Sequence, residues 1–86
     1  MKIKKQVILR SVAGEHMLIP AGETVLEYNG IFTMTESGKF LWENIVKGAE
    51  EKELVNLLIQ EYGIDSDIAS SDVNEFIEML RTFGII

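Results

Sequence analysis

The first part of the chain alternates short apolar runs with turn residues, the pattern of a small antiparallel sheet. Val7–Val12 is rich in β-branched and aliphatic residues and is followed by a turn signal at Gly14. His16–Ile19 is a second apolar run, and the Pro-Ala-Gly segment ending at Gly22 closes it. These two runs predict a pair of neighbouring strands.

Two more apolar runs, Thr24–Leu26 and Ile31–Met34, flank a turn sequence. The turn is Tyr28-Asn29-Gly30, and Asn-Gly between apolar runs is a strong hairpin signal because both turn residues must adopt positive φ. We therefore predict a three-stranded antiparallel sheet within residues 7–34.

The rest of the chain has helical periodicity, beginning directly after this sheet. Thr35 is a good N-cap, and Leu41, Trp42 and Ile45 follow on one face of a helix that Gly48 ends.

A second helix is predicted to start near Ala49 and Glu50, where acidic residues complement the positive end of the helix dipole. No Ser, Thr, Asp or Asn is placed to cap it, so its start is the least defined boundary. Gly63 is suited to end it. The expected buried stripe of this helix is Leu54, Leu57, Leu58 and Tyr62.

The third helix has two alternative starts, at Asp65 or, after a break, at Ser70 or Ser71, and it ends at Gly84. Its apolar residues follow the i, i+3, i+4, i+7 rule: Ala69, Val73, Phe76, Ile77, Leu80 and Phe83. A sheet followed by three short helices is a winged helix-turn-helix-like α+β fold.

Composition fits one small globular domain spanning residues 1–86, in which we expect residues 1–6 to form a flexible arm. The absence of cysteine excludes disulfides, thiolate metal sites and a cysteine nucleophile. No apolar run reaches the ~20 residues that span a bilayer, and no secretory signal is recognisable. We therefore expect a cytoplasmic protein with no membrane contact.

Charge is distributed unevenly along the chain. Residues 1–14 carry four basic and no acidic side chains, whereas residues 15–86 carry four basic side chains against all fourteen acids, for a net charge of −6. An acidic body repels phosphate backbones, because nucleic-acid affinity depends on basic side chains that displace counterions.

No catalytic or metal-binding constellation is evident, and we expect neither a metal nor a cofactor. His16 is the chain's one histidine, so a multi-histidine metal site is excluded. The serines likewise have no histidine other than His16 that could activate them in a catalytic triad. The Asp65-Ser66-Asp67 segment is similar to the attachment site of acyl carrier proteins, but those are all-helical and the strands here contradict that fold.

A winged-helix nucleic-acid-binding protein is the main alternative, because the second and third helices have suitable length and spacing. The third helix offers only Arg81 and Asn74 for contacts to DNA, among several acids, which argues against this reading. A small enzyme subunit or structural protein without a peptide ligand is a further alternative.

Several segments together resemble the pyrroloquinoline quinone biosynthesis protein D (PqqD) family. Met34–Trp42 is similar to the family's Leu-Asn-Glu-Thr-Gly-x-x-Ile-Trp segment, with Thr35 in place of Asn and Lys39 in place of a small residue. Leu57–Ile64 resembles its Leu-x-x-x-Tyr-x-Val stretch, and Asp72–Leu80 resembles its Asp-Val-x-x-Phe-Leu-x-x-Leu segment.

This resemblance implies a RiPP recognition element: a non-catalytic peptide chaperone for a ribosomally made precursor peptide. Such a module captures the leader peptide and presents it to a tailoring enzyme, often a radical SAM (S-adenosylmethionine) enzyme. The implied partners are therefore a precursor peptide and a peptide-modifying enzyme, with no nucleic acid.

The resemblance also implies where the peptide binds. The leader adds as a strand to the edge formed by Ile31, Phe32, Thr33 and Met34. The opposite wall is the third helix, through Val73, Phe76, Ile77, Leu80 and Phe83. Without the resemblance, Val73, Phe76, Ile77 and Leu80 at helical spacing are expected to be core, and some can serve both as core and as groove floor. Glu75 and Met79 lie off that stripe and could form the rim. Whether a second copy occupies the edge in a homodimer stays open.

Overall fold

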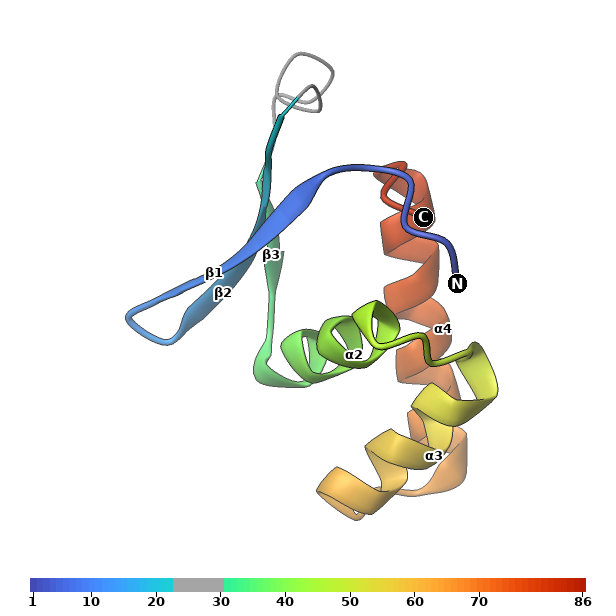
Figure 1. Cartoon of the computed structure of the whole chain (residues 1–86). Helices are drawn as coiled ribbons and strands as arrows, with labels where there is room; N and C mark the ends of the chain where they lie inside the picture. The colour runs from blue at the N-terminus through green and yellow to red at the C-terminus, as the bar shows by residue number, and fades with distance from the viewer. Residues whose placement is uncertain (23–30) are drawn as a thin grey trace.

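The computed structural model describes residues 1–22 and 31–86, and in this part of the chain a three-stranded antiparallel sheet precedes three helices, as predicted (Figure 1). The strands stand in the order β1-β2-β3. Their bounds and those of the helices are β1 (Val7–Val12), β2 (Glu15–Pro20), β3 (Phe32–Met34), α2 (Glu36–Val46), α3 (Glu51–Tyr62) and α4 (Ser66–Thr82).

The sheet is built on a tight β1–β2 hairpin. Ala13 and Gly14 both have positive φ, 53° and 82°, as a two-residue turn between right-twisted strands requires. Strand β2 pairs on its other side with β3, from His16 opposite Met34 to Leu18 opposite Phe32. Strand β3 therefore has β2 on one side and no described strand on the other.

The predictions for the second half of the sheet are tested only in part. The expected strand Thr24–Leu26 and the Tyr28-Asn29-Gly30 turn lie outside the described residues. The strand expected at Ile31–Met34 begins one residue later, at Phe32.

Local chemistry sets the helix boundaries largely as the sequence indicates. The Thr35 hydroxyl accepts a hydrogen bond from the Gly38 N–H at 3.2 Å, so Thr35 caps α2 as predicted. Helix α3 is capped without Ser, Thr, Asp or Asn, because the Glu53 carboxylate accepts from the backbone N–H of the N-cap residue Glu50 at 3.2 Å. Gly63 ends α3 in the left-handed conformation.

Helix α4 is continuous from Ser66, with Asp65 at its N-cap position. Of the two predicted starts, the break before Ser70 or Ser71 is therefore wrong. The physical reason is that Ala69 and Val73, one helical turn apart, are both fully buried, and only a helix running through the serines places both on the inner face.

One core joins the sheet to all three helices. Its buried apolar side chains are Leu18, Phe32, Leu41, Trp42, Ile45, Ala49, Leu54, Leu58, Ala69, Val73, Phe76, Ile77, Leu80 and Ile85. Two predicted members of the buried stripes lie at the surface instead. Tyr62 is 44% exposed and packs edge-on against Phe40, and Phe83 is 37% exposed because it follows the last turn of α4.

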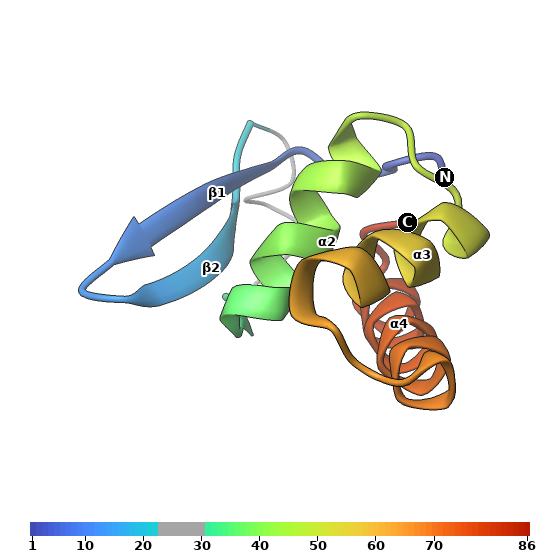
Figure 2. The ribbon, with the colours of Figure 1, turned by 90° about the horizontal axis from the view of Figure 1, so that it is seen from below.

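The N-terminal segment lies beside the end of α4 in both views of the ribbon (Figures 1 and 2). The Lys4 N–H donates to the carbonyl of Ile85 at 2.7 Å, and Ile3 packs against the core. The flexibility that we expect for residues 1–6 stays a prediction. Across the described ranges, no helix combines the length and apolar character needed to cross a membrane.

Candidate functional site

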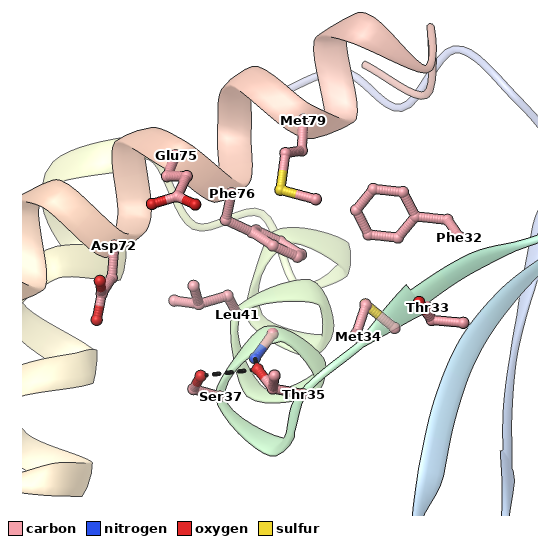
Figure 3. A pocket seen from close by; sticks show the side chains of 11 residues that line it. Phe32, Thr33, Met34, Thr35, Ser37, Leu41, Asp72, Glu75, Phe76 and Met79 are labelled. Atoms are coloured by element: carbon pink, nitrogen blue, oxygen red, sulfur yellow. Dashed lines mark hydrogen bonds between the residues drawn. The ribbon is translucent and has the colours of Figure 1, made fainter.

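A pocket of about 330 Å³ opens between strand β3, the first turns of α2 and one face of α4 (Figure 3). This volume is at the small end of the ~300–1,000 Å³ that is common for ligand sites. The lining residues are Phe32, Thr33, Met34, Thr35, Ser37, Gly38, Leu41, Asp72, Glu75, Phe76 and Met79.

Strand β3 supplies one wall of the pocket and also its aromatic anchor. Phe32 is only 4% exposed, and its ring packs edge-on against Phe76, with centroids 6.1 Å apart, and against Phe83, at 5.1 Å. Edge-to-face packing of this kind is the favoured geometry of aromatic pairs. The three rings hold β3 against the C-terminal half of α4.

The first turn of α2 closes one end of the pocket. The Thr35 hydroxyl is engaged by the Gly38 N–H and lies 3.1 Å from the Ser37 hydroxyl (Figure 3). Gly38 permits close approach of this turn to its neighbours. A Cβ at position 38 would lie 3.1 Å from the Cβ of Met34 and 3.4 Å from the ring of Phe76.

Helix α4 supplies the opposite wall with a single face. Asp72, Glu75, Phe76 and Met79 stand at i, i+3, i+4 and i+7, which places them in one row on the helix surface. This row lies next to the buried stripe, and Phe76 belongs to both. The pocket face of α4 is therefore turned partly away from the core, and Met79 is 43% exposed.

The predicted site residues separate into three groups. Phe32, Thr33, Met34 and Phe76 line the pocket. Ile31 is exposed just before β3, and Phe83 packs edge-on against Phe32 without lining the pocket. The remaining three, fully buried in the core and absent from the pocket lining, are Val73, Ile77 and Leu80.

The apolar stripe of α4 marks the face that meets the rest of the core, as the helical spacing of these residues also predicted. Glu75 and Met79, expected at the rim, do line the pocket. Asp72 completes the same row and could have been found from the spacing to these two residues. The contribution of Gly38 and Leu41 depends on how α2 packs and has no comparable signal in the sequence.

A polar network joins the sheet to the first turn of α2, where Glu36 lies between the pocket residues Thr35 and Ser37. The side chain of His16 is 6% exposed, and its Nε2 lies 2.8 Å from Glu36 Oε1 and its Nδ1 2.7 Å from the Ser11 hydroxyl. A carboxylate only accepts, so Nε2 donates to Glu36, and in the neutral ring Nδ1 accepts from Ser11. The hydrogen bond from His16, and after it the electrostatic interaction with His16, lower the pKa of Glu36.

Among residues 1–22 and 31–86, no three His, Asp or Glu side chains are grouped so that they could hold a metal ion. Among the described residues, the pocket lining contains two carboxylates, three hydroxyls and apolar side chains, with no basic side chain. Such a lining can bury an apolar side chain and pair with a cation.

The fold and pocket together define an α+β domain in which a helix-walled pocket lies beside a sheet edge that no described strand covers. The model of the family "Coenzyme PQQ synthesis protein D (PqqD)" matches residues 15–86. The chain belongs to the PqqD family.

Comparison with solved structures adds a relative of the same fold. The structure "TbiB1 in Complex with the TbiA(beta) Leader Peptide" superposes with a TM-score of 0.78, covering 99% of this chain and 93% of that chain at 21% identity. A search of the curated proteins gives no match.

Proposed function

We propose that this protein is a non-catalytic binding module for the leader segment of a ribosomally made precursor peptide. The leader adds to the outer edge of β3 as a further strand and inserts apolar side chains into the neighbouring pocket. Membership in the PqqD family and the fold shared with a protein solved with a leader peptide support this proposal. The observation that carries it is the pocket lying against the strand whose outer edge no described strand covers.

Backbone pairing by itself cannot supply the affinity. Strand β3 has three residues, and since successive residues point their N–H and C=O groups to opposite sides, about two to four of these groups face outward. At roughly 0.5–1.5 kcal/mol for each hydrogen bond, they contribute about 1–6 kcal/mol. Ordering a disordered leader costs about 2–5 kcal/mol, so burial of apolar leader side chains in the pocket must decide the binding.

We further propose that the bound leader is presented to a peptide-modifying enzyme, of the radical S-adenosylmethionine class as in the family. The physical advantage is effective concentration, because a tethered precursor meets the enzyme as an intramolecular partner. The enzyme should then modify the full precursor only when this protein is present.

The test begins with capture of peptides from the native lysate by the tagged protein and their identification by mass spectrometry. The synthetic leader of a captured precursor is then titrated by fluorescence anisotropy. Replacing Met79 with Gln keeps the side-chain length but makes the pocket wall polar, and we expect roughly five- to tenfold weaker binding, about 1 kcal/mol. Amide hydrogen exchange in β3 should slow when the leader binds.

Lys52→Ala is the matched control, because Lys52 is exposed on α3 and does not line the pocket. Its leader affinity should equal that of the original protein. A folded Met79→Gln variant that binds the leader with unchanged affinity, or a leader that leaves exchange in β3 unchanged, would contradict the proposed site. Aspartate at Phe32 or Phe76 is a poorer test, since both side chains are core members and the variant would unfold.

A further inference from the structure

The two carboxylates of the pocket have no partner among the described residues. Asp72 and Glu75 line the pocket, and no other described residue forms a hydrogen bond or ion pair with either of them. Other acids have structural partners: Glu78 pairs with Arg81 at 2.7 Å on the same helix, and Glu36 pairs with His16. The hydroxyls facing the pocket from α2 are engaged with each other and with the backbone.

The pair also has a local electrostatic cost. Asp72 and Glu75 are three residues apart on α4 and therefore adjacent on its surface, where like charges repel. None of the described residues that line the pocket is a Lys, Arg or His that could offset them. A cation brought by a ligand would relieve this repulsion and gain two hydrogen-bond acceptors.

The pocket is divided into a charged end and an apolar end. Figure 3 shows Asp72 toward the first turn of α2, and Met79 beside Phe32 at the other end, with Phe76 between them. Along α4, the acidic pair Asp72 and Glu75 precedes the apolar pair Phe76 and Met79 by four residues. At 1.5 Å per residue, the centres of the two pairs lie about 6 Å apart along the helix.

The distance between side chains on the same face of a peptide strand matches this separation. Strand residues advance about 3.3 Å each and alternate between the two faces, so side chains at i and i+2 share a face and lie about 6.6 Å apart. Figures 1 and 3 show β3 and α4 standing apart with roughly parallel axes, so a strand added to β3 also runs roughly along α4.

We propose, resting on the function proposed above, that the protein selects leaders in which a Lys or Arg lies two positions from an apolar residue. The apolar side chain enters the pocket between Phe32, Phe76 and Met79. The basic side chain pairs with Asp72 and Glu75. Each exposed ion pair should contribute a factor of about two to five in affinity, and the on-rate should fall with increasing salt.

The test is selection from a phage-displayed library of random dodecapeptides on four immobilised proteins. The original protein should enrich Lys or Arg two positions from an aliphatic or aromatic residue. The double variant Asp72→Asn/Glu75→Gln should still enrich the apolar residue but no longer the basic one. The double variant Asp72→Lys/Glu75→Lys should enrich Asp or Glu two positions from the apolar residue. Glu43→Gln/Glu61→Gln, which removes two exposed charges outside the pocket, should select as the original protein does.

Anisotropy then measures the pairing directly. An enriched peptide and its Lys→Met counterpart should differ about two- to fivefold per ion pair with the original protein and should not differ with Asp72→Asn/Glu75→Gln. A thermal melt followed by circular dichroism checks that each variant is folded.

The outcomes separate this inference from the proposed function. Apolar enrichment with no basic preference, or a basic preference that persists in Asp72→Asn/Glu75→Gln, overturns the inference and leaves peptide binding intact. No enrichment with any of the four proteins overturns peptide binding, and this inference with it.

Discussion

At the scale of single residues, Gly38 and Phe76 decide the shape of the pocket. Phe76 belongs both to the core and to the pocket wall, so its substitution changes stability and binding together. Gly38 lets the first turn of α2 lie against Met34 and Phe76, where a Cβ would be closer than ordinary van der Waals contact. Because Gly38 has no side chain, α2 can approach these two residues closely.

Gly38→Ala tests this role. Helix propensity alone would raise the free energy of unfolding by up to about 1 kcal/mol. The new Cβ would meet the Cβ of Met34, which moves only with strand β3, so we expect no gain in stability and weaker leader binding. Urea unfolding and leader titration measure both. Ser70→Ala, on the exposed side of α4, is the control and should raise the free energy of unfolding by about 0.5 kcal/mol. If Gly38→Ala raised the free energy of unfolding as much as Ser70→Ala and left the leader affinity unchanged, the contact with Met34 would not restrict position 38.

At the scale of elements, the bond between His16 and Glu36 holds the β1–β2 hairpin to the first turn of α2, which in turn forms one end of the pocket. The lowered pKa of Glu36 means that folding favours its ionised form. The stabilisation is therefore complete above the unfolded pKa of about 4.5 and is lost as the pH falls through the lower folded value.

Glu36→Gln should consequently be less stable than the original protein at pH 7, and the difference in free energy of unfolding should shrink below about pH 4.5. Urea unfolding at pH 7, 5, 4 and 3 gives this difference. In a His16→Gln background, the same substitution should show little pH dependence. A difference that is constant with pH in the original background would mean that the pair does not stabilise the fold.

At the scale of the whole molecule, the charge distribution opposes nucleic-acid binding even though the helices are arranged as in a winged helix. Residues 15–86 contain fourteen acids and four basic side chains, and the pocket face of α4 carries two of those acids. A groove-binding helix needs basic and amide side chains toward the DNA.

We therefore expect no measurable binding to a random-sequence DNA duplex at about 0.15 M salt, the ionic strength at which nonspecific binders still show affinity. Anisotropy with a labelled duplex over a salt series measures it. Tight binding that weakens steeply with salt would favour the winged-helix nucleic-acid alternative over a peptide-binding module.

Sequence reasoning recovered most of the fold and part of the candidate site. The caps at Thr35 and Gly63 and the periodicity of the helices were readable because each depends on residues within about four positions. The start of α3 was poorly defined because its capping residue is a glutamate, a residue seldom found at that position. Of the predicted binding residues, Phe32, Thr33, Met34 and Phe76 line the pocket, whereas Val73, Ile77 and Leu80 lie in the core.

The sequence by itself determined the elements, their order and the uneven charge, because these follow from local backbone chemistry and from composition. The tertiary structure alone decided which row of α4 faces β3, that Phe76 serves core and pocket, and that His16 meets Glu36 twenty positions away. The reason is physical. Periodicity identifies the apolar face of a helix, but which neighbouring row is left half-covered depends on the angle and register at which distant elements pack.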